Sequence, residues 1–223
     1  MLGLYHVLEC ITSAFPNVLF ESCSGGGGRF DPGMLFYMPQ TWTSDDTDAV
    51  ERLKLQYGTS FVYPASSIGA HVSAVPNHQT GRSVPLKMRG DVALGGNFGF
   101  ELDPGKLLPE ELEEAKQMVT RVKSLRDLTR QGTFWRLLSP FEGQLTAWAF
   151  VSENRKDILL CAYSVLSVPN CAPVRVRLQG LEPGYQYKAE DGRLYSGAAL
   201  MYQGITLPLD RDFSSFVLLL KAV

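Results

Sequence analysis

The feature that most constrains the fold is a change of sequence pattern at Gly132. Before it, short apolar runs alternate with polar loops and with apolar stripes of helical period. After it, the chain consists of short runs rich in β-branched and aromatic residues. Alternating strands and helices are typical of parallel α/β architecture, whereas successive short strands indicate antiparallel sheet. The sequence therefore predicts two regions, residues 1–130 and residues 131–223.

Apolar side chains at helical spacing predict three helices in the first region, at residues 1–15, 49–57 and 109–131. Pro16 should end the first helix, and Gly58 should follow the C-cap of the second. The third is the clearest, since a proline suits its first turn and a glycine follows it. Its predicted buried face consists of Leu112, Ala115, Val119 and Val122.

Continuous apolar runs predict strands that are buried on both faces, and polar loops follow two of them. In the first region these runs lie at residues 18–20, 61–63 and 97–102, with a further apparent strand ending at Trp42. In the second region the runs predict an antiparallel sandwich, with a hairpin at Asp191-Gly192. They occupy residues 134–138, 146–151, 158–166, 174–178, 185–189, 194–196 and 215–220.

Composition excludes some classes of function. The 223 residues include 21 Lys and Arg against 23 Asp and Glu, with no basic stripe, which argues against a nucleic-acid partner. The longest apolar runs, such as residues 216–220, are too short to span a membrane, and no signal peptide is evident. Four cysteines without a Cys-x-x-Cys pair indicate a reducing compartment, so we expect a cytoplasmic protein; they are Cys10, Cys23, Cys161 and Cys171.

The first polar loop is rich in glycine and runs from Ser24 to Arg29. It lacks the Gly-Lys-Ser/Thr ending of a P-loop and does not match G-x-G-x-x-G. Two interpretations remain open, a flexible turn or a segment whose backbone approaches a ligand closely. Cys23 would face that ligand in the second case and would be a small buried side chain in the first.

The second polar loop contains four residues that suit either helix capping or acid–base chemistry. Asp46, Thr47 and Asp48 precede a predicted helix, where capping and a favourable dipole interaction explain them. Asp45 lies at the strand end behind Trp42, where a carboxyl group could serve as a general acid. His71 and His78 are expected in a loop without further ligands at metal spacing, so we expect no metal site.

Four stretches resemble the α-galactosidases of glycoside hydrolase family 36. They are LFESCSGGGGRFD (residues 19–31), WTSDDTD (42–48), HVSAVPNHQTGR (71–82) and GGNFGFEL (95–102), in the order of the family. The resemblance implies the second half of a (β/α)₈ barrel at residues 1–130 and a C-terminal antiparallel β-sandwich at residues 131–223. It also implies a retaining mechanism on terminal α-galactosides such as melibiose and raffinose, without a cofactor.

The resemblance assigns roles residue by residue. Asp45 matches the acid/base carboxylate, and Cys23 with the backbone of Gly25 and Gly26 matches contacts to sugar hydroxyls. Arg29, Asp31 and Trp42 match residues that support the site without touching the sugar. Close alternatives are a galactosyltransferase or an α-N-acetylgalactosaminidase on the same scaffold. From another class, a non-catalytic carbohydrate-binding module is the alternative.

One part of the family pattern is absent. The nucleophile of the family is the aspartate of a Lys-Trp-Asp motif, and no such motif occurs in these residues. Asp46 and Asp48 cannot replace it, because they follow Asp45 in the same turn instead of facing it across the scissile bond. We therefore expect a fragment that is inactive by itself, with Met1 inside a family helix and self-association through open sheet edges. A full-length parent is expected to be a homo-oligomer.

Overall fold

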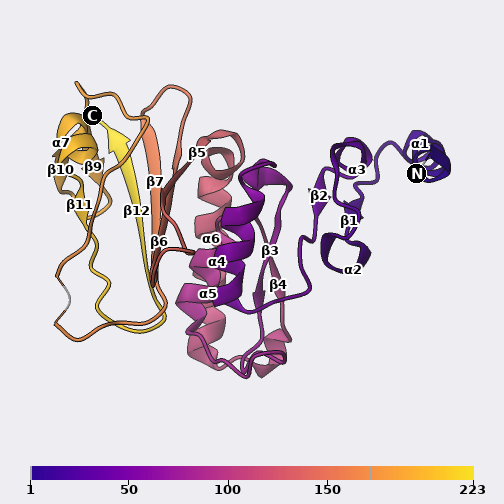
Figure 1. The fold of residues 1–223 in the computed structure, drawn as a ribbon, viewed down its shortest axis with the longest axis horizontal. Helices are drawn as coiled ribbons and strands as arrows, with labels where there is room; N and C mark the ends of the chain where they lie inside the picture. The colour runs from indigo at the N-terminus through magenta and orange to yellow at the C-terminus, as the bar shows by residue number, and fades with distance from the viewer. Residues whose placement is uncertain (1, 171) are drawn as a thin grey trace.

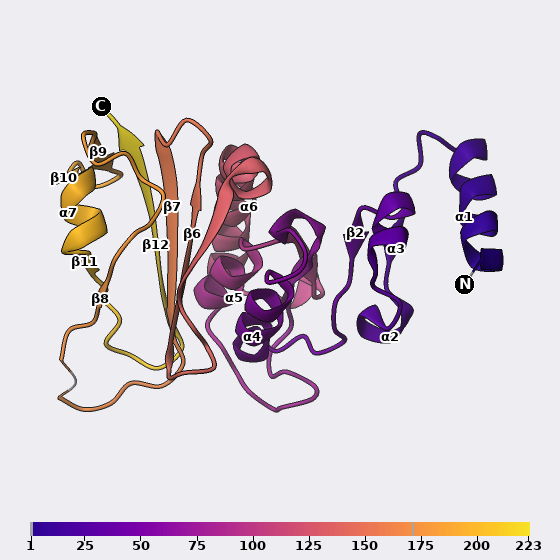
Figure 2. The same cartoon turned by 45° about the horizontal axis from the view of Figure 1, so that its top comes forward.

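The computed structural model describes residues 2–170 and 172–223, so Met1 and the predicted free thiol of Cys171 lie outside the described residues. Figure 1 shows three blocks along the long axis. An antiparallel sheet lies at one end, a block of helices with two parallel strands lies in the middle, and an arm of residues 2–41 carries the N-terminus at the other end. Figure 2 shows the same arrangement from a second direction.

Four short strands of the first region run parallel to one another. β1 (Glu21–Ser22) pairs with β2 (Gln40–Thr41), and β3 (Gly69–Ser73) pairs with β4 (Asn97–Glu101). A single parallel bridge between Thr41 and Ile68 joins the two pairs. The strands therefore follow one another in space in the order β1, β2, β3, β4, and all their carboxyl ends lie at one edge.

Helices connect these strands as parallel pairing requires. After α1 (Leu2–Ala14), the short helices α2 (Ser24–Gly27) and α3 (Pro32–Tyr37) lie between β1 and β2. Then α4 (Ala49–Thr59) connects β2 to β3, and α5 (Leu86–Ala93) connects β3 to β4. Single 3₁₀ turns occupy Ala65–Ser67 and Pro104–Lys106.

The helix after β4, α6 (Pro109–Gln131), confirms the clearest prediction from sequence. It begins with Pro109, and the Glu111 side chain accepts a hydrogen bond from the Leu108 amide at 3.0 Å. Gly132 is its C-cap. The predicted buried face is correct only in part, because Ala115 is buried but Leu112 is 39% exposed.

After Gly132 the chain is antiparallel, as predicted. Six strands form one sheet in the order β10-β9-β12-β7-β6-β5, and two more pair beside α7 (Gly197–Tyr202). Asp191-Gly192 forms the turn between β9 and β10, where Gly192 has φ of +87°. The strands are β5 (Thr133–Leu138), β6 (Leu145–Val151), β7 (Asp157–Ser164), β8 (Arg175–Val176), β9 (Gln186–Ala189), β10 (Leu194–Ser196), β11 (Ile205–Thr206) and β12 (Ser214–Ala222).

The six-stranded sheet is buried on both faces. Leu160 and Ala162 of β7 pack toward β8, β11 and α7, whereas Leu159, Cys161 and Tyr163 alternate with them and pack on the helices of the first region. The Tyr163 hydroxyl also donates a hydrogen bond of 2.7 Å to the backbone carbonyl of Asp91 on α5. The two regions predicted from sequence therefore share one core at the helix-covered face of the sheet.

Two predicted strands are wrong. Residues 18–20 are not a strand, because β1 begins at Glu21 and Leu19 is 81% exposed. Residues 61–63 form a turn, where Phe61 and Val62 are 62% and 75% exposed. α4 also continues through Gly58 to Thr59, instead of ending before it. Three apolar residues carry too little periodicity to distinguish a buried strand from an exposed connection.

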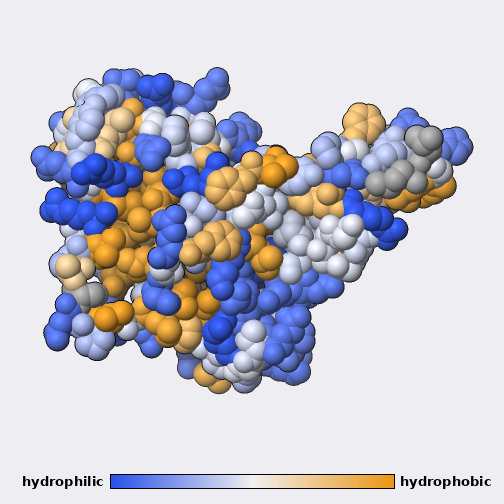
Figure 3. All heavy atoms as spheres, viewed as in Figure 1, coloured by the Kyte–Doolittle hydropathy of each residue, from blue (hydrophilic) through white to orange (hydrophobic). Residues whose placement is uncertain are grey.

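The first helix is confirmed, but its apolar stripe is largely uncovered. Leu8 is buried, whereas Ile11 and Phe15 are 38% and 58% exposed. Figure 3 shows apolar atoms, in orange, at the surface of this arm. Among residues 2–170 and 172–223, no helix combines the length and apolar character needed to cross a bilayer.

Candidate active site

The candidate site lies where the four parallel strands end. Cys23 follows β1 directly, and the segment from Trp42 to Asp45 follows β2. Side chains alternate across the strands, so Ala70 and Val72 of β3 are fully buried on the helix side while His71 lies on the opposite, open face. His71 is thus a strand residue, and its predicted loop position is wrong; His78 does lie in the loop that follows.

Asp45 is exposed at the carboxyl end of β2. Within the described part of the chain, no residue donates a hydrogen bond to its carboxylate or pairs with it. Its two acidic neighbours differ, because Asp46 accepts a hydrogen bond from the Asp48 amide at 3.0 Å and Asp48 caps α4. Sequence reasoning left capping and chemistry open for this loop, and the structure separates Asp45 from Asp46 and Asp48, whose carboxylates are engaged by hydrogen bonds within the loop.

The glycine-rich loop packs directly on the Asp45 segment. A Cβ on Gly26 would lie 2.9 Å from the Asp45 backbone nitrogen and 3.1 Å from the Ser44 Cα. A Cβ on Gly25, by contrast, would meet nothing within 4 Å. Gly26 is therefore needed because the chain approaches itself, while Gly25 and the exposed Cys23 leave open space beside them.

Arg29 and Asp31 lie where they hold this loop and its neighbours. The Arg29 guanidinium donates a hydrogen bond to the Ser24 hydroxyl, which closes the loop. Asp31 caps α3 by accepting from the Met34 amide at 2.8 Å, and it accepts from the Tyr5 hydroxyl at 3.0 Å. The amide of Met34, followed by that hydroxyl, holds the pKa of Asp31 below its usual range despite some desolvation.

Trp42 is buried and anchored by a cation that sequence reasoning missed. The Arg52 guanidinium of α4 lies 4.5 Å from the centre of the indole and donates to the Gly69 carbonyl at 2.6 Å and the Ser44 carbonyl at 3.3 Å. Burial lowers the pKa of Arg52 to about 10, against the opposing effects of Asp46 and Glu101. A charged residue in the middle of an amphipathic helix gives no sequence signal for such a role.

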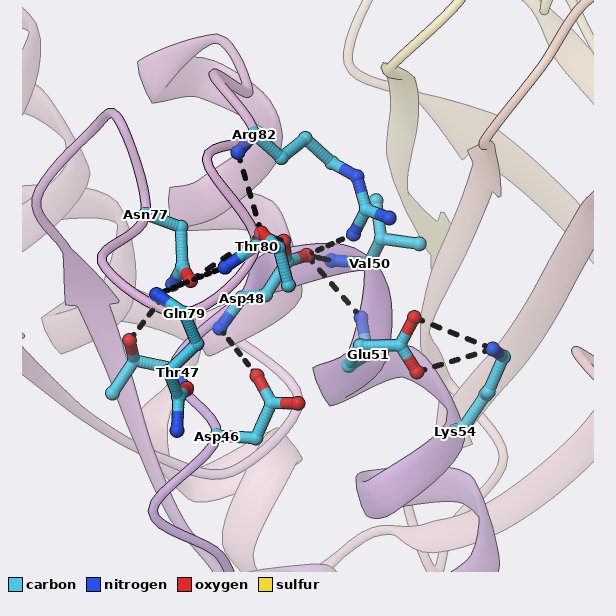
Figure 4. A network of polar contacts seen from close by, with 10 residues as sticks. All are labelled: Asp46, Thr47, Asp48, Val50, Glu51, Lys54, Asn77, Gln79, Thr80 and Arg82. Carbon is cyan, nitrogen blue, oxygen red and sulfur yellow. Dashed lines mark hydrogen bonds and ion pairs between the residues drawn. The ribbon is translucent and has the colours of Figure 1, made fainter.

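The loop after β3 locks the start of α4 in place, as Figure 4 shows. Asp48 accepts hydrogen bonds from the Val50 amide at 2.8 Å and the Thr80 hydroxyl at 2.5 Å, and pairs with Arg82 at 2.6 Å. The Asn77 amide group donates to the Thr47 hydroxyl at 2.9 Å. Asp48 is therefore a structural carboxylate, and the same network limits the movement of the loop that presents Asp45.

The described residues around the candidate site do not form a set of metal ligands. Within residues 2–170 and 172–223, no group of three or more His, Cys, Asp or Glu side chains is arranged to hold a metal ion. The polar groups that follow β1 and β2 at the candidate site are the Asp45 carboxylate, the Cys23 thiol and backbone amides. Such groups can bind hydroxyls and transfer protons.

Two family models match the chain. The family model described as Melibiase matches residues 1–132, and the model described as Glycosyl hydrolase family 36 C-terminal domain matches residues 145–220. The chain belongs to glycoside hydrolase family 36. The resemblance given by the four sequence stretches is thereby confirmed.

Individual curated proteins match all or nearly all of the chain. Alpha-galactosidase AgaA of Geobacillus stearothermophilus is 58% identical over 100% of this chain and 31% of its own length. A bifunctional alpha-galactosidase/sucrose kinase, AgaSK, of Mediterraneibacter gnavus is 50% identical over 93% of this chain and 22% of its own length. The chain thus spans about a third or less of these relatives.

The fold agrees with solved structures of family 36. A structure of an AgaA variant with 1-deoxygalactonojirimycin superposes with a TM-score of 0.98 at 57% identity, covering 100% of this chain and 31% of that one. A second AgaA variant, solved in complex with raffinose, gives the same TM-score and coverage.

Proposed function

We propose that this chain supplies the acid/base carboxylate of a retaining α-galactosidase, and that Asp45 carries it. In the first step Asp45 protonates the glycosidic oxygen as the bond to the galactosyl carbon breaks, and in the second it removes a proton from the attacking water. The observation that carries this proposal is the free, exposed Asp45 carboxylate beside two aspartates that are engaged within the loop, Asp46 by the Asp48 amide and Asp48 as the cap of α4.

The barrel prediction is supported by the order of the elements. Four parallel strands, each followed by helix, match the second half of a (β/α)₈ barrel at residues 1–130. Residues 131–223 form the C-terminal β-sandwich in this proposal, in which the six-stranded sheet and the β8–β11 pair are the two layers. Active sites of such barrels lie at the carboxyl ends of the strands, where Asp45 lies.

Galactose would occupy the space beside the glycine-rich loop. Cys23 and the backbone of Gly25 and Gly26 are proposed to contact its hydroxyls, since Gly25 faces open space and the thiol is exposed. Arg29 and Trp42 would act indirectly, by holding the loop and the strand end. This division follows from the contacts that each side chain already makes within the chain.

Residues 1–223 are not expected to complete the reaction alone. A retaining glycosidase needs a second carboxyl group about 5–5.5 Å from the first, on the opposite side of the scissile bond. Asp46 and Asp48 cannot supply it, because both are engaged in the loop that carries Asp45. General acid catalysis by itself contributes roughly 10²–10⁴-fold, against the 10⁶-fold or more of most enzymes.

The substrate is proposed to be a terminal α-galactoside, as the names of the relatives suggest. The raffinose complex of AgaA makes that trisaccharide the first oligosaccharide to test. Cys10, Cys23 and Cys161 are free thiols, in keeping with a reducing compartment, and a cytoplasmic location remains part of the proposal.

A chimera tests the proposal. Residues 1–223 would replace the matching segment of AgaA, which is 58% identical, so that the rest of the relative supplies the missing groups. We expect the chimera to hydrolyse raffinose and an aryl α-galactoside. The Asp45→Asn variant should lose about 10²–10⁴-fold in raffinose turnover, the contribution of acid–base catalysis.

The matched control is Asp210→Asn, which alters an aspartate whose side chain is 86% exposed in the second region. This variant should keep full activity. A folded Asp45→Asn chimera with unchanged raffinose turnover would refute the assignment. Galactose binding by residues 1–223 without any gain of turnover in the chimera would favour a carbohydrate-binding module instead.

A further inference from the structure

We infer that His71 is a positioning residue that acts through Trp42 to fix Asp45 for proton transfer to the leaving group. This inference rests on the proposed function. His71 touches neither Asp45 nor the space beside Gly25 in the contacts described above. Its effect would pass through the packing of one aromatic ring on another.

The His71 imidazole is stacked on the Trp42 indole. The ring centres are 4.4 Å apart and the planes are inclined by 16°. On its other neighbouring strand, the ring lies over Gly99, where a Cβ would be 2.9 Å from the imidazole Cδ2. His71 and Gly99 are direct partners in the β3–β4 pairing, so the absence of a side chain at residue 99 makes room for the ring.

A carboxylate lies close to the imidazole as well. The His71 Nδ1 lies 3.5 Å from the Glu101 Oε2 at the end of β4. This contact is a third neighbour of the ring, beside the Trp42 indole and Gly99. Trp42, His71 and Glu101 therefore form a connected row from the residue after β2, across the middle of β3, to the end of β4.

Trp42 transmits this restraint to the acid/base loop, because only Thr43 and Ser44 separate it from Asp45. The indole is confined elsewhere too, since a Cβ on Gly69 would lie 3.2 Å from its Cε3. Arg52 restrains the indole and the Ser44 carbonyl together. With these neighbours in place, removing the imidazole opens space on the indole and lets the Asp45 segment shift.

A shift of this kind should impair proton donation more than sugar binding. The proposed sugar contacts lie on the loop after β1, whereas the imidazole supports the segment after β2. A glycoside with a poor leaving group needs a proton from Asp45 as its bond breaks, but 2,4-dinitrophenol leaves without one. The leaving group therefore distinguishes misplacement of the acid from damage to the sugar site.

The test compares kcat/KM of the AgaA chimera for methyl α-galactoside and for 2,4-dinitrophenyl α-galactoside. His71→Ala should lower the value for the methyl glycoside about 10- to 100-fold, as expected for an acid displaced by a fraction of an ångström to 1 Å. The value for the dinitrophenyl glycoside should fall less than about threefold, on the same argument. His71→Phe, which retains a ring to stack on Trp42, should restore most of the loss.

His78→Ala is the matched control, because His78 is exposed in the loop after β3 and is not stacked on the indole. It should leave both values unchanged. Equal losses for the two glycosides in His71→Ala, or no loss in either, would overturn the inference. If His71→Ala fails to fold, a His71→Phe chimera with wild-type selectivity supports the stacking role, and one that is impaired equally on both glycosides contradicts it.

The experiments distinguish a wrong assignment of Asp45 from a wrong assignment of His71. If Asp45→Asn leaves methyl α-galactoside turnover unchanged, Asp45 is not the acid, and the role of His71 falls with it. If Asp45→Asn abolishes that turnover while His71→Ala does not alter the preference between the two glycosides, only the inference about His71 is wrong.

Discussion

Gly26 lies against the backbone of Asp45, so closely that a single added methyl group would sit 2.9 Å from the Asp45 amide nitrogen. The two residues come from loops that follow different strands, β1 and β2. The contact places the proposed sugar-binding loop and the proposed acid at a fixed separation. It also makes Gly26 sensitive to the smallest possible substitution.

We therefore predict that Gly26→Ala inactivates the AgaA chimera by about 10-fold or more, because an acid misplaced by 1 Å can lose up to about 100-fold. The left-handed backbone at φ of +72° adds about 1–2 kcal/mol of strain to any alanine there. Raffinose turnover and thermal unfolding measure the two effects.

Gly192→Ala separates strain from displacement. Gly192 also has positive φ, +87°, but an added Cβ would meet nothing within 4 Å, and the residue lies in the β9–β10 turn. Its alanine variant should lose a similar stability and keep its activity. Equal activity in Gly26→Ala and Gly192→Ala would show that the close contact between Gly26 and Asp45 does not contribute to activity.

Asp48 should make the stability of the chain depend on pH. Burial raises its pKa, but hydrogen bonds from Thr80, Arg82 and the Val50 amide outweigh that effect, so the pKa lies below its ordinary value of 3.8. A carboxylate with a lowered folded pKa stabilises the native state fully above its unfolded pKa, and this contribution is lost as the pH falls through the folded pKa.

Asp48→Asn should therefore cost about 1.5–3 kcal/mol at pH 7, the usual range for hydrogen bonds to a charged group. The loss of unfolding free energy relative to wild type should shrink as the pH falls below about 4, because the wild-type carboxyl group becomes protonated there and is then uncharged, like asparagine. Urea unfolding of wild type and variant at pH 7 and at a pH below about 4 measures this difference in unfolding free energy. A deficit that is the same at both would contradict the role of the Asp48 charge.

The thiols should differ sharply in reactivity. Cys161 is fully buried, and burial raises its pKa to about 12, whereas Cys10 and Cys23 are exposed. In a Cys171→Ser variant we expect a thiol reagent to label Cys10 and Cys23 in the native state and Cys161 only after unfolding. Rapid native labelling of Cys161, identified by peptide mass, would contradict the shared core on the helix side of the sheet.

Open sheet edges should cause residues 1–223 to self-associate. Among the described residues, neither β1 nor β4 has a strand on its outer side, and Leu19, two residues before β1, and Phe36 of α3 are 81% and 79% exposed. Size-exclusion chromatography should therefore show elution that shifts with concentration. The AgaA chimera, in which these edges gain partners, should elute like AgaA, and a monodisperse monomer of residues 1–223 would refute the prediction.

The elements that could be predicted from sequence are those with enough residues to show a period. α6 extends over 23 residues, and all seven predicted runs after Gly132 correspond to strands. Residues 18–20 and 61–63 were mistaken for strands because an apolar triplet is equally compatible with an exposed turn. Asp45, Cys23 and the glycines were located by local pattern and resemblance, whereas Arg52 and His71 had no such signal.

By itself, the sequence determined the order of strands and helices, the change to antiparallel sheet at Gly132, and the family to which the chain belongs. These properties depend on residues close together in the sequence, because hydrophobic periodicity, turn residues and sequence motifs are all local features. Only the tertiary structure decided which aspartate of the Asp45–Asp48 loop is free, that Gly26 abuts it, and that His71 lies on Trp42. Such relationships join residues from separate strands, so they come into existence only when the chain folds.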